Sequence, residues 1–122
     1  MDLTPYIRNV PDFPKPGIQF KDITTLVANV EAFRYVIDTW KKRYSNQNVS
    51  VIAATDARGF IFGGALAYAM GIPFVPVRKK GKLPWDKISA SFDLEYGSDC
   101  LELHVDALKP GVPVFFIAGD ND

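Results

Sequence analysis

The chain has 122 residues, and its 14 basic and 14 acidic side chains give a formal net charge of zero. This length suits one domain with a single core, and an apolar fraction of 48% is ordinary for a folded globular chain. A balanced charge gives no overall attraction to nucleic acid or to an anionic membrane. No apolar run is long enough to cross a bilayer, so neither nucleic acid nor a membrane is an expected partner.

The chain contains one cysteine, Cys100, and one histidine, His104. A single cysteine excludes a disulfide within the chain, and a single histidine excludes a multi-histidine metal site. No basic region followed by an apolar run marks a secretory signal at the N-terminus. We therefore expect a cytoplasmic protein, in which both of these side chains are structural.

The segment Met1–Gly17 shows weak periodicity. Three prolines and a glycine, from Pro11 to Gly17, disfavour a helix and favour extended backbone and turns. We expect a structured surface loop here.

A helix is predicted at Val30–Tyr44. Asn29 is suited to the N-cap, and Glu31 lies in the first turn. Apolar residues then recur at helical spacing along one face, which indicates a packing role. These residues are Phe33, Val36, Ile37, Trp40 and Tyr44.

The next segments predict a β-strand, α-helix, β-strand unit. The apolar runs Val49–Thr55 and Phe74–Arg78 are typical of buried parallel strands, and the segment Phe60–Met70 between them has helix length. Gly71 follows at a position suited to a helix C-cap. In such units ligands bind at the carboxyl ends of the strands, where Asp56-Ala57-Arg58-Gly59 stands.

Two interpretations of the Asp56–Gly59 segment carry equal weight. It can hold a phosphate with backbone N–H groups and an arginine, or it can be a turn linked by an ion pair. The second strand is followed by Arg78-Lys-Lys-Gly-Lys82, with four cations in five residues. Such a cluster is more often a solvated loop, but its place at a neighbouring strand end favours a phosphate site.

The remaining chain predicts a loop, a hairpin and a third core strand. Residues 79–87 have loop composition, residues 90–105 alternate apolar side chains with a turn near Gly97-Ser98, and Val112–Ile117 reads as a buried strand. The alternation of strands and helices predicts an α/β fold with a mainly parallel sheet and flanking helices.

Four ordered segments resemble the adenine phosphoribosyltransferase family, which has a type I phosphoribosyltransferase fold. They are Phe13-Pro-Lys-Pro-Gly-Ile-Gln-Phe-Lys-Asp-Ile23, Asp56-Ala-Arg-Gly-Phe-Ile-Phe-Gly63, Val77-Arg-Lys-Lys-Gly-Lys-Leu-Pro84 and Leu94-Glu-Tyr-Gly97. The resemblance extends to about Ile117. An unrelated nucleotide-binding module is disfavoured, because four long motifs match in order.

The resemblance implies a purine-salvage enzyme that forms AMP and pyrophosphate from adenine and phosphoribosyl pyrophosphate, with Mg²⁺ bound to the latter. It implies a homodimer, an N-terminal hood at residues 1–28 and a mobile loop and hairpin at residues 79–105. It also implies a non-proline cis peptide in the Asp56–Gly59 loop.

The resemblance also assigns roles to individual residues. Catalytic roles fall on Arg58, at the leaving pyrophosphate, and on Glu95, which assists at the purine. Substrate-binding roles fall on Gln19, Lys21, Asp56, Ala57, Gly59, Arg78, Lys82 and Tyr96. Within this set, the backbone around Gln19 reads the adenine edge, and Arg78 and Lys82 hold the pyrophosphate. No residue of the chain is assigned to a metal.

The sequence departs from the family pattern after the third strand. The family has paired aspartates there, followed by a glycine-rich loop for the ribose and the 5′-phosphate, whereas this chain continues with Ala118-Gly119. We therefore expect a domain truncated after its third core strand, with little or no activity in the 122-residue chain. The alternative to an active enzyme is a non-catalytic module that binds nucleotide or pyrophosphate, or forms a dimer.

Overall fold

The computed structural model describes residues 1–94, 97–104 and 112–117. The chain divides into two compact units, Met1–Trp40 and Lys41–Asp122. None of the helices in the described ranges is both long enough and apolar enough to cross a membrane.

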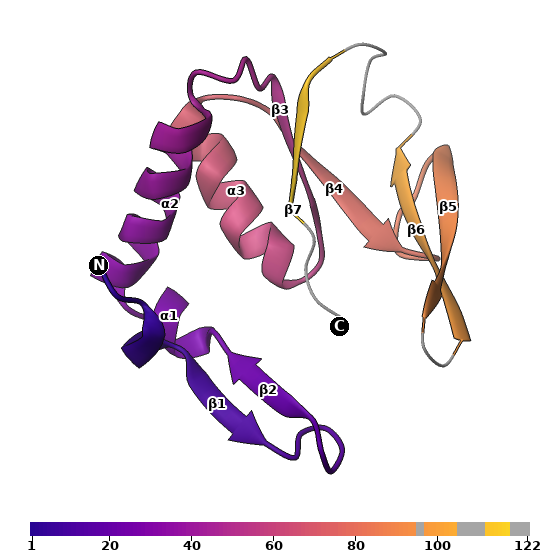
Figure 1. The fold of residues 1–122 in the computed structure, drawn as a ribbon. Coiled ribbons are helices and arrows are strands. Elements are labelled where there is room, and N and C mark those ends of the chain that lie inside the picture. The colour runs from indigo at the N-terminus through magenta and orange to yellow at the C-terminus, as the bar shows by residue number, and fades with distance from the viewer. Residues whose placement is uncertain (95–96, 105–111, 118–122) are drawn as a thin grey trace. The chain divides into compact units, whose positions relative to one another are not determined.

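The first unit begins with the 3-10 turn η1 (Thr4–Tyr6) and an antiparallel pair of strands, β1 (Arg8–Pro11) and β2 (Gln19–Asp22), followed by the short helix α1 (Thr24–Val27) (Figure 1). The expectation of a surface loop is therefore wrong for these residues. Regular pairing is compatible with the prolines because Pro11 ends a strand and the other two lie in the connecting turn. The Asp12 carboxylate accepts a hydrogen bond from the Gly17 N–H (2.8 Å) across that turn.

Helix α2 (Val30–Tyr44) has the bounds predicted from its periodicity. Its first turn is capped as expected, since Asn29 Oδ1 accepts a hydrogen bond from the Ala32 N–H at 2.9 Å. At its other end, the Tyr44 ring packs on Phe115 with 4.3 Å between the ring centroids.

The second unit is built on a five-stranded mixed sheet. Its strands are β3 (Val51–Thr55), β4 (Phe74–Lys79), β5 (Lys87–Leu94), β6 (Gly97–His104) and β7 (Val114–Ile117). They lie in the order β5-β6-β4-β3-β7; β3 pairs in parallel with β4 and β7, and β6 pairs antiparallel with β4 and β5. The predicted α/β class is confirmed, and the sheet, predicted to be mainly parallel, is mixed because the predicted hairpin adds its strands to one side in antiparallel pairing.

Helix α3 (Arg58–Met70) begins two residues earlier than the predicted Phe60. Arg58 and Gly59 therefore lie in its first turn and not in a loop, because the chain turns into the helix directly after β3. Gly71 ends the helix in the left-handed conformation, with φ of 69°, as the sequence predicted.

Helix α3 packs on one face of the sheet. A Cβ atom added at Gly63 would lie 2.8 Å from the Ala54 Cβ and 2.8 Å from Cε2 of Phe74, so the helix backbone nearly touches the strands. On the opposite face, β3 and β4 contribute the buried valines and alanine of a second cluster: Val51, Ala53, Val75 and Val77. All five residues of β3 are buried, as expected of a strand covered on both faces.

This close approach predicts opposite effects for two neighbouring glycines of α3. Gly63→Ala should lower the free energy of unfolding, because overpacking a rigid site costs about 1–3 kcal/mol. Gly64→Ala should raise it by about 0.5–1 kcal/mol, because a Cβ there meets no atom within 4 Å and alanine favours the helix. Urea unfolding of both variants beside the wild type measures the difference. Equal stabilities of the two variants would contradict the described contact.

Candidate functional site

The first group of predicted site residues meets where β3 and β4 end. Arg78 Nη2 lies 3.3 Å and Nε lies 3.4 Å from Oδ2 of Asp56, so an ion pair joins the two strand ends. The predicted salt link exists, although it connects neighbouring strands and is not confined to the Asp56–Gly59 segment. The guanidinium also lies 5.8 Å from the ring centroid of Phe60.

The Asp56–Arg78 pair leaves capacity for a further ligand. Oδ1 of Asp56 is buried and accepts no hydrogen bond from the part of the chain that the structure describes. The Arg78 side chain remains 35% exposed, and its distances to Oδ2 of Asp56 are long for a charge-assisted bond. An anion at this strand end can therefore engage the guanidinium.

The N-terminus of α3 lies at the same strand end. Its N-cap residue, Ala57, is exposed and has no side-chain oxygen to occupy the first backbone N–H groups. These groups, together with the helix dipole, favour negative charge. The Asp56–Ala57 peptide is cis, as the family resemblance implied.

Gly59 allows this helix end to approach the sheet. A Cβ atom at Gly59 would lie 3.1 Å from the backbone oxygen of Ile117 and 3.3 Å from the Ala54 Cβ. The close approach brings the first turn of α3 against the ends of β3 and β7. Arg58, the residue before Gly59, is half-buried in that turn.

The cationic segment after β4 forms a defined turn. The Lys82 N–H donates to the Lys79 carbonyl (3.2 Å), and Gly81 has φ of 86°. The Gly81 N–H donates to Oε1 of Glu102 at 2.8 Å. The sequence analysis missed Glu102. The signal that could have identified it is its place between Leu101 and Leu103, because alternation along a strand puts the acid on the opposite face from both leucines.

The predicted residues of the hood lie in the first unit. Gln19 and Lys21 are exposed on one face of β2, and the Asn9 side chain of β1 joins them. Asn9 Nδ2 donates to Oε1 of Gln19 (2.9 Å), and its Oδ1 accepts from Nζ of Lys21 (2.8 Å). Sequence reasoning did not identify Asn9, because its role depends on the pairing of β1 with β2.

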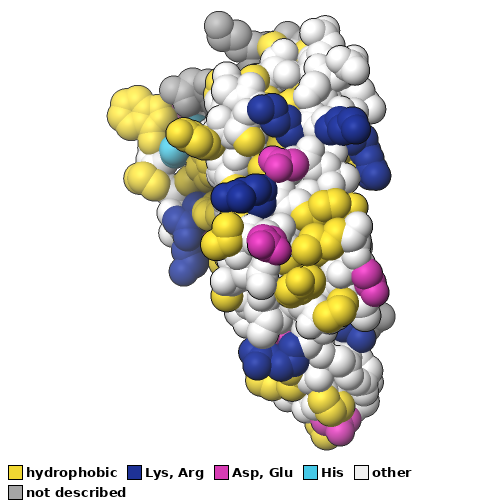
Figure 2. Space-filling model, turned by 90° about the vertical axis from the view of Figure 1, so that its left-hand side faces the viewer, with side chains coloured by type: hydrophobic (Ala, Val, Ile, Leu, Met, Phe, Trp, Pro, Cys, Tyr) yellow, Lys and Arg dark blue, Asp and Glu magenta, His cyan; other side chains and the backbone are white. Residues whose placement is uncertain are grey.

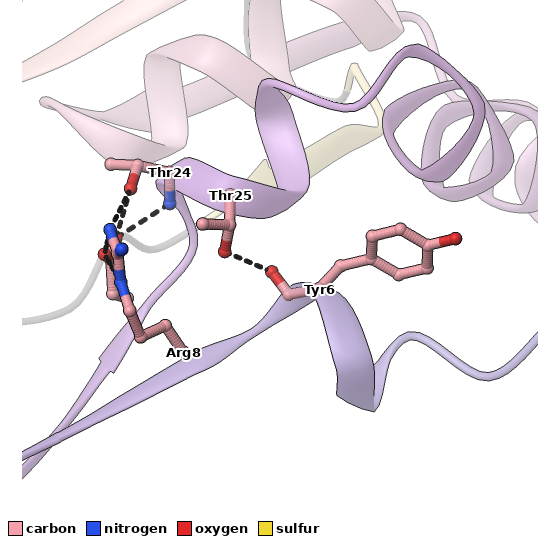
Figure 3. A network of polar contacts seen from close by, with 5 residues as sticks. Tyr6, Arg8, Thr24 and Thr25 are labelled. Atoms are coloured by element: carbon pink, nitrogen blue, oxygen red, sulfur yellow. Dashed lines mark hydrogen bonds and ion pairs between the residues drawn. The ribbon is translucent and has the colours of Figure 1, made fainter.

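A polar network ties this hairpin to α1. Figure 3 shows Arg8 beside Thr24, and Thr25 donating from Oγ1 to the Tyr6 carbonyl at 2.6 Å. Asp22 accepts hydrogen bonds from Nε of Arg8 and from both the N–H and the hydroxyl of Thr24. The two Thr24 hydrogen bonds, followed by the Arg8 bond, lower the pKa of Asp22 from 3.8 to about 2.

Three predictions from the sequence fall on residues outside the described ranges. Glu95 and Tyr96 follow β5, and the Ala118-Gly119 departure follows β7. The balanced charge of the sequence is visible on the face drawn in Figure 2, where basic and acidic side chains are interspersed.

Comparison with known proteins gives one consistent result. A protein of Roseiflexus castenholzii named adenine phosphoribosyltransferase is 54% identical over 117 residues, which cover 96% of this chain and 68% of the relative. A protein of the same name from Clostridium tetani is 56% identical over 111 residues, covering 91% of this chain and 64% of the relative. This chain thus spans about two thirds of the length of these relatives. No family model matches the chain.

Solved structures give the same result. The crystal structure of adenine phosphoribosyltransferase from Thermoanaerobacter pseudethanolicus superposes with a TM-score of 0.91 at 47% identity, covering 95% of this chain and 67% of that protein. The Saccharomyces cerevisiae enzyme, determined with adenine and an imino-altritol bisphosphate, gives a TM-score of 0.86 at 36% identity. That match covers 93% of this chain and 67% of the yeast chain.

The Asp22 network predicts a measurable pH dependence. The folded-state pKa of about 2 lies below the ordinary value of 3.8, so Asp22 stabilises the hairpin above pH 3.8. This contribution is lost as the pH falls toward 2. An NMR titration of the Asp22 carboxyl should show the lowered pKa.

Two variants separate the causes of that shift. Thr24→Val, which removes the largest cause, should raise the Asp22 pKa more than Arg8→Ala does. A wild-type pKa near 4, or the reverse order of the two variants, would contradict the network.

Proposed function

The chain belongs to the adenine phosphoribosyltransferase family, and we propose that it binds adenine and phosphoribosyl pyrophosphate and forms AMP and pyrophosphate. The observation that carries this proposal is the strand end at which the Asp56–Arg78 pair lies beside the N-terminus of α3, the positive end of the helix dipole. This arrangement suits a pyrophosphate group, which carries several negative charges.

The proposed chemistry is the displacement of pyrophosphate from C1′ of the ribose by N9 of adenine. Negative charge grows on the leaving pyrophosphate as the C1′–O bond breaks. The N–H groups of the first turn of α3, with Arg58 in that turn, are placed to stabilise this charge. Arg78 adds a second guanidinium, and the exposed Lys82 adds an ammonium group.

Arg78 is proposed to exchange its partner when the substrate binds. Its side chain is partly exposed and its distances to Oδ2 of Asp56 are long, so the guanidinium is held weakly in this pair. Before binding, Asp56 holds the guanidinium at the strand end. A pyrophosphate oxygen then offers the guanidinium a stronger, charge-assisted bond.

The hood is the proposed adenine site. β2 pairs with β1 along one edge, and among the described residues no strand pairs with its other edge. Backbone groups around Gln19 on such an edge can hydrogen-bond the edge of a purine. Asn9 holds Lys21 and the Gln19 side chain beside one another on one face.

Glu95 and Tyr96 complete the proposal by family resemblance. Glu95 is proposed to assist at the purine, and Tyr96 to close over the site. Residues 1–28 serve as the hood and residues 79–105 as the loop and hairpin. We also propose a homodimer and a cytoplasmic location.

Magnesium is proposed as part of the substrate. Within residues 1–94, 97–104 and 112–117, no group of three or more His, Cys, Asp or Glu side chains is arranged to hold a metal ion. Mg²⁺ commonly reaches enzymes bound to substrate phosphates and water. Bound to phosphoribosyl pyrophosphate, it neutralises part of the charge that Arg58 and Arg78 also face.

A second candidate function is binding without turnover. Its support is the sequence Ala118-Gly119, which stands where the family has paired acids for the ribose. Without those acids, the ribose loses one of its anchors, and orientation supplies much of the rate in such a reaction.

One experiment distinguishes the two candidates. Purified 122-residue protein, free of host enzyme, is incubated with adenine, phosphoribosyl pyrophosphate and Mg²⁺, and AMP is measured. Calorimetric titration with Mg²⁺-pyrophosphate is run in parallel. Turnover typical of the family supports the enzyme, pyrophosphate binding without turnover supports the second candidate, and neither signal refutes both.

Arg58→Ala tests the proposed chemistry in an active form of the protein. Because Arg58 acts on charge that builds in the transition state, kcat should fall on the order of a hundredfold. The KM for adenine should change by less than about threefold. Arg43→Ala, which removes an exposed cation from the last turn of α2, is the matched control. An unchanged kcat with weakened adenine binding would refute the role of Arg58.

A further inference from the structure

Glu102 is a buried acid that the proposed chemistry does not use. Its side chain is 5% exposed, and it is the single charged residue among the buried side chains of the described chain. The register of β6 places it directly across from Arg78 of β4, so both side chains point to the same face of the sheet. A buried carboxylate requires hydrogen bonds or cations nearby, because its desolvation is costly.

The partner of Glu102 is the turn that carries Lys82. Oε1 of Glu102 accepts the Gly81 N–H at 2.8 Å, and the next N–H, from Lys82, donates to the Lys79 carbonyl. Gly81 has φ of 86°, a conformation that side-chain-bearing residues rarely adopt. The two hydrogen bonds hold the peptide groups on the two sides of the Gly81 Cα atom, Lys80–Gly81 and Gly81–Lys82.

Strand β6 makes a second contact with this segment, at Pro84, three residues after Gly81. Nε2 of His104 lies 2.9 Å from the Pro84 carbonyl, and because a carbonyl only accepts, the imidazole N–H donates. His104 is two residues beyond Glu102, so both lie on one face of β6. Between the two attachments Leu83 is buried at 7% exposure, while Lys82 remains exposed.

From these contacts we infer that Glu102 is a positioning residue, which acts through Gly81 to present Lys82 to pyrophosphate. This inference rests on the proposed function, in which Lys82 binds that group. The hydrogen-bond acceptor matters and the negative charge does not, because the bond to a backbone N–H fixes the turn. Without it, the Lys80–Gly81 peptide can rotate, the turn loosens, and Lys82 samples directions away from the ligand.

Two conservative variants separate the effect of the Glu102 hydrogen-bond acceptor from the effect of its negative charge. Glu102→Gln keeps an acceptor oxygen at the same reach and loses the charge, whereas Glu102→Asp keeps the charge and is shorter by one methylene. Titration with Mg²⁺-pyrophosphate should show up to about tenfold weaker binding for Glu102→Asp, the loss expected for one hydrogen bond. Glu102→Gln should stay within about threefold of the wild type. The reverse order would overturn the inference.

A double-mutant cycle tests whether the effect passes through Lys82. In a Lys82→Ala background, Glu102→Asp should change pyrophosphate affinity by less than about twofold. A general loss of structure would instead weaken binding equally in both backgrounds, and that result would overturn the inference. Asp86→Asn, which removes an exposed acid from the same segment, controls for charge and should bind as the wild type does.

A measurement without ligand keeps this inference separate from the proposed function. Amide hydrogen exchange at Gly81 should be protected in the wild type and in Glu102→Gln, and should be faster in Glu102→Asp. If the wild type fails to bind pyrophosphate, the proposed function fails, and with it the role of Lys82. If the wild type binds but Gly81 exchanges equally in all three proteins, the positioning by Glu102 is wrong.

Discussion

The close packing of α3 on β3 is the constraint on which the candidate site depends. Gly63 brings the helix backbone against Ala54, and Gly59 brings its first turn against the carbonyl of Ile117. Because the helix axis is fixed this near to the sheet, its N-terminal N–H groups lie at the carboxyl ends of β3 and β7. Larger side chains at these two positions would displace the helix and separate its positive end from the strand ends.

Two acids organise the cations of this strand end. Asp56 pairs with Arg78 from the neighbouring strand, and Glu102 binds the backbone of the turn that carries Lys82. The two acids act differently. Asp56 contacts the guanidinium of Arg78 directly, whereas Glu102 fixes the turn and so the direction in which Lys82 is presented. Flexible cations lose conformational entropy when they bind an anion, so a turn that is already fixed reduces this cost.

Local signals in the sequence predicted much of the fold. Helix α2 has its predicted bounds because Asn29 and a regular apolar face define it, and the β3-α3-β4 unit follows from two buried runs around a helix-length segment. The strands β1 and β2 were missed, because each has four residues and their pairing depends on side chains of both strands. The sequence placed Asp56 and Arg78 at neighbouring strand ends but did not predict their contact. These residues are 22 positions apart and meet only through the parallel pairing of their strands. Glu102 was overlooked because a single acid in a strand is usually exposed, and its partner lies 21 positions away.

The register of the β5–β6 hairpin links the proposed pyrophosphate and purine functions. The hairpin pairs Leu94 with Gly97 at one end, directly beside Glu95 in the sequence, and its β6 strand pairs Glu102 with Arg78 of β4. A shift of β6 by one residue would turn Glu102 to the opposite face of the sheet and away from Gly81. The alternation Leu101-Glu102-Leu103 opposes this shift, because it would bury the acid among the valines of β3 and β4 and remove both leucines from that cluster. The apolar pattern of one strand therefore fixes the orientation of the acid that holds the Lys82 turn, and the same hairpin carries the residue proposed to act at the purine.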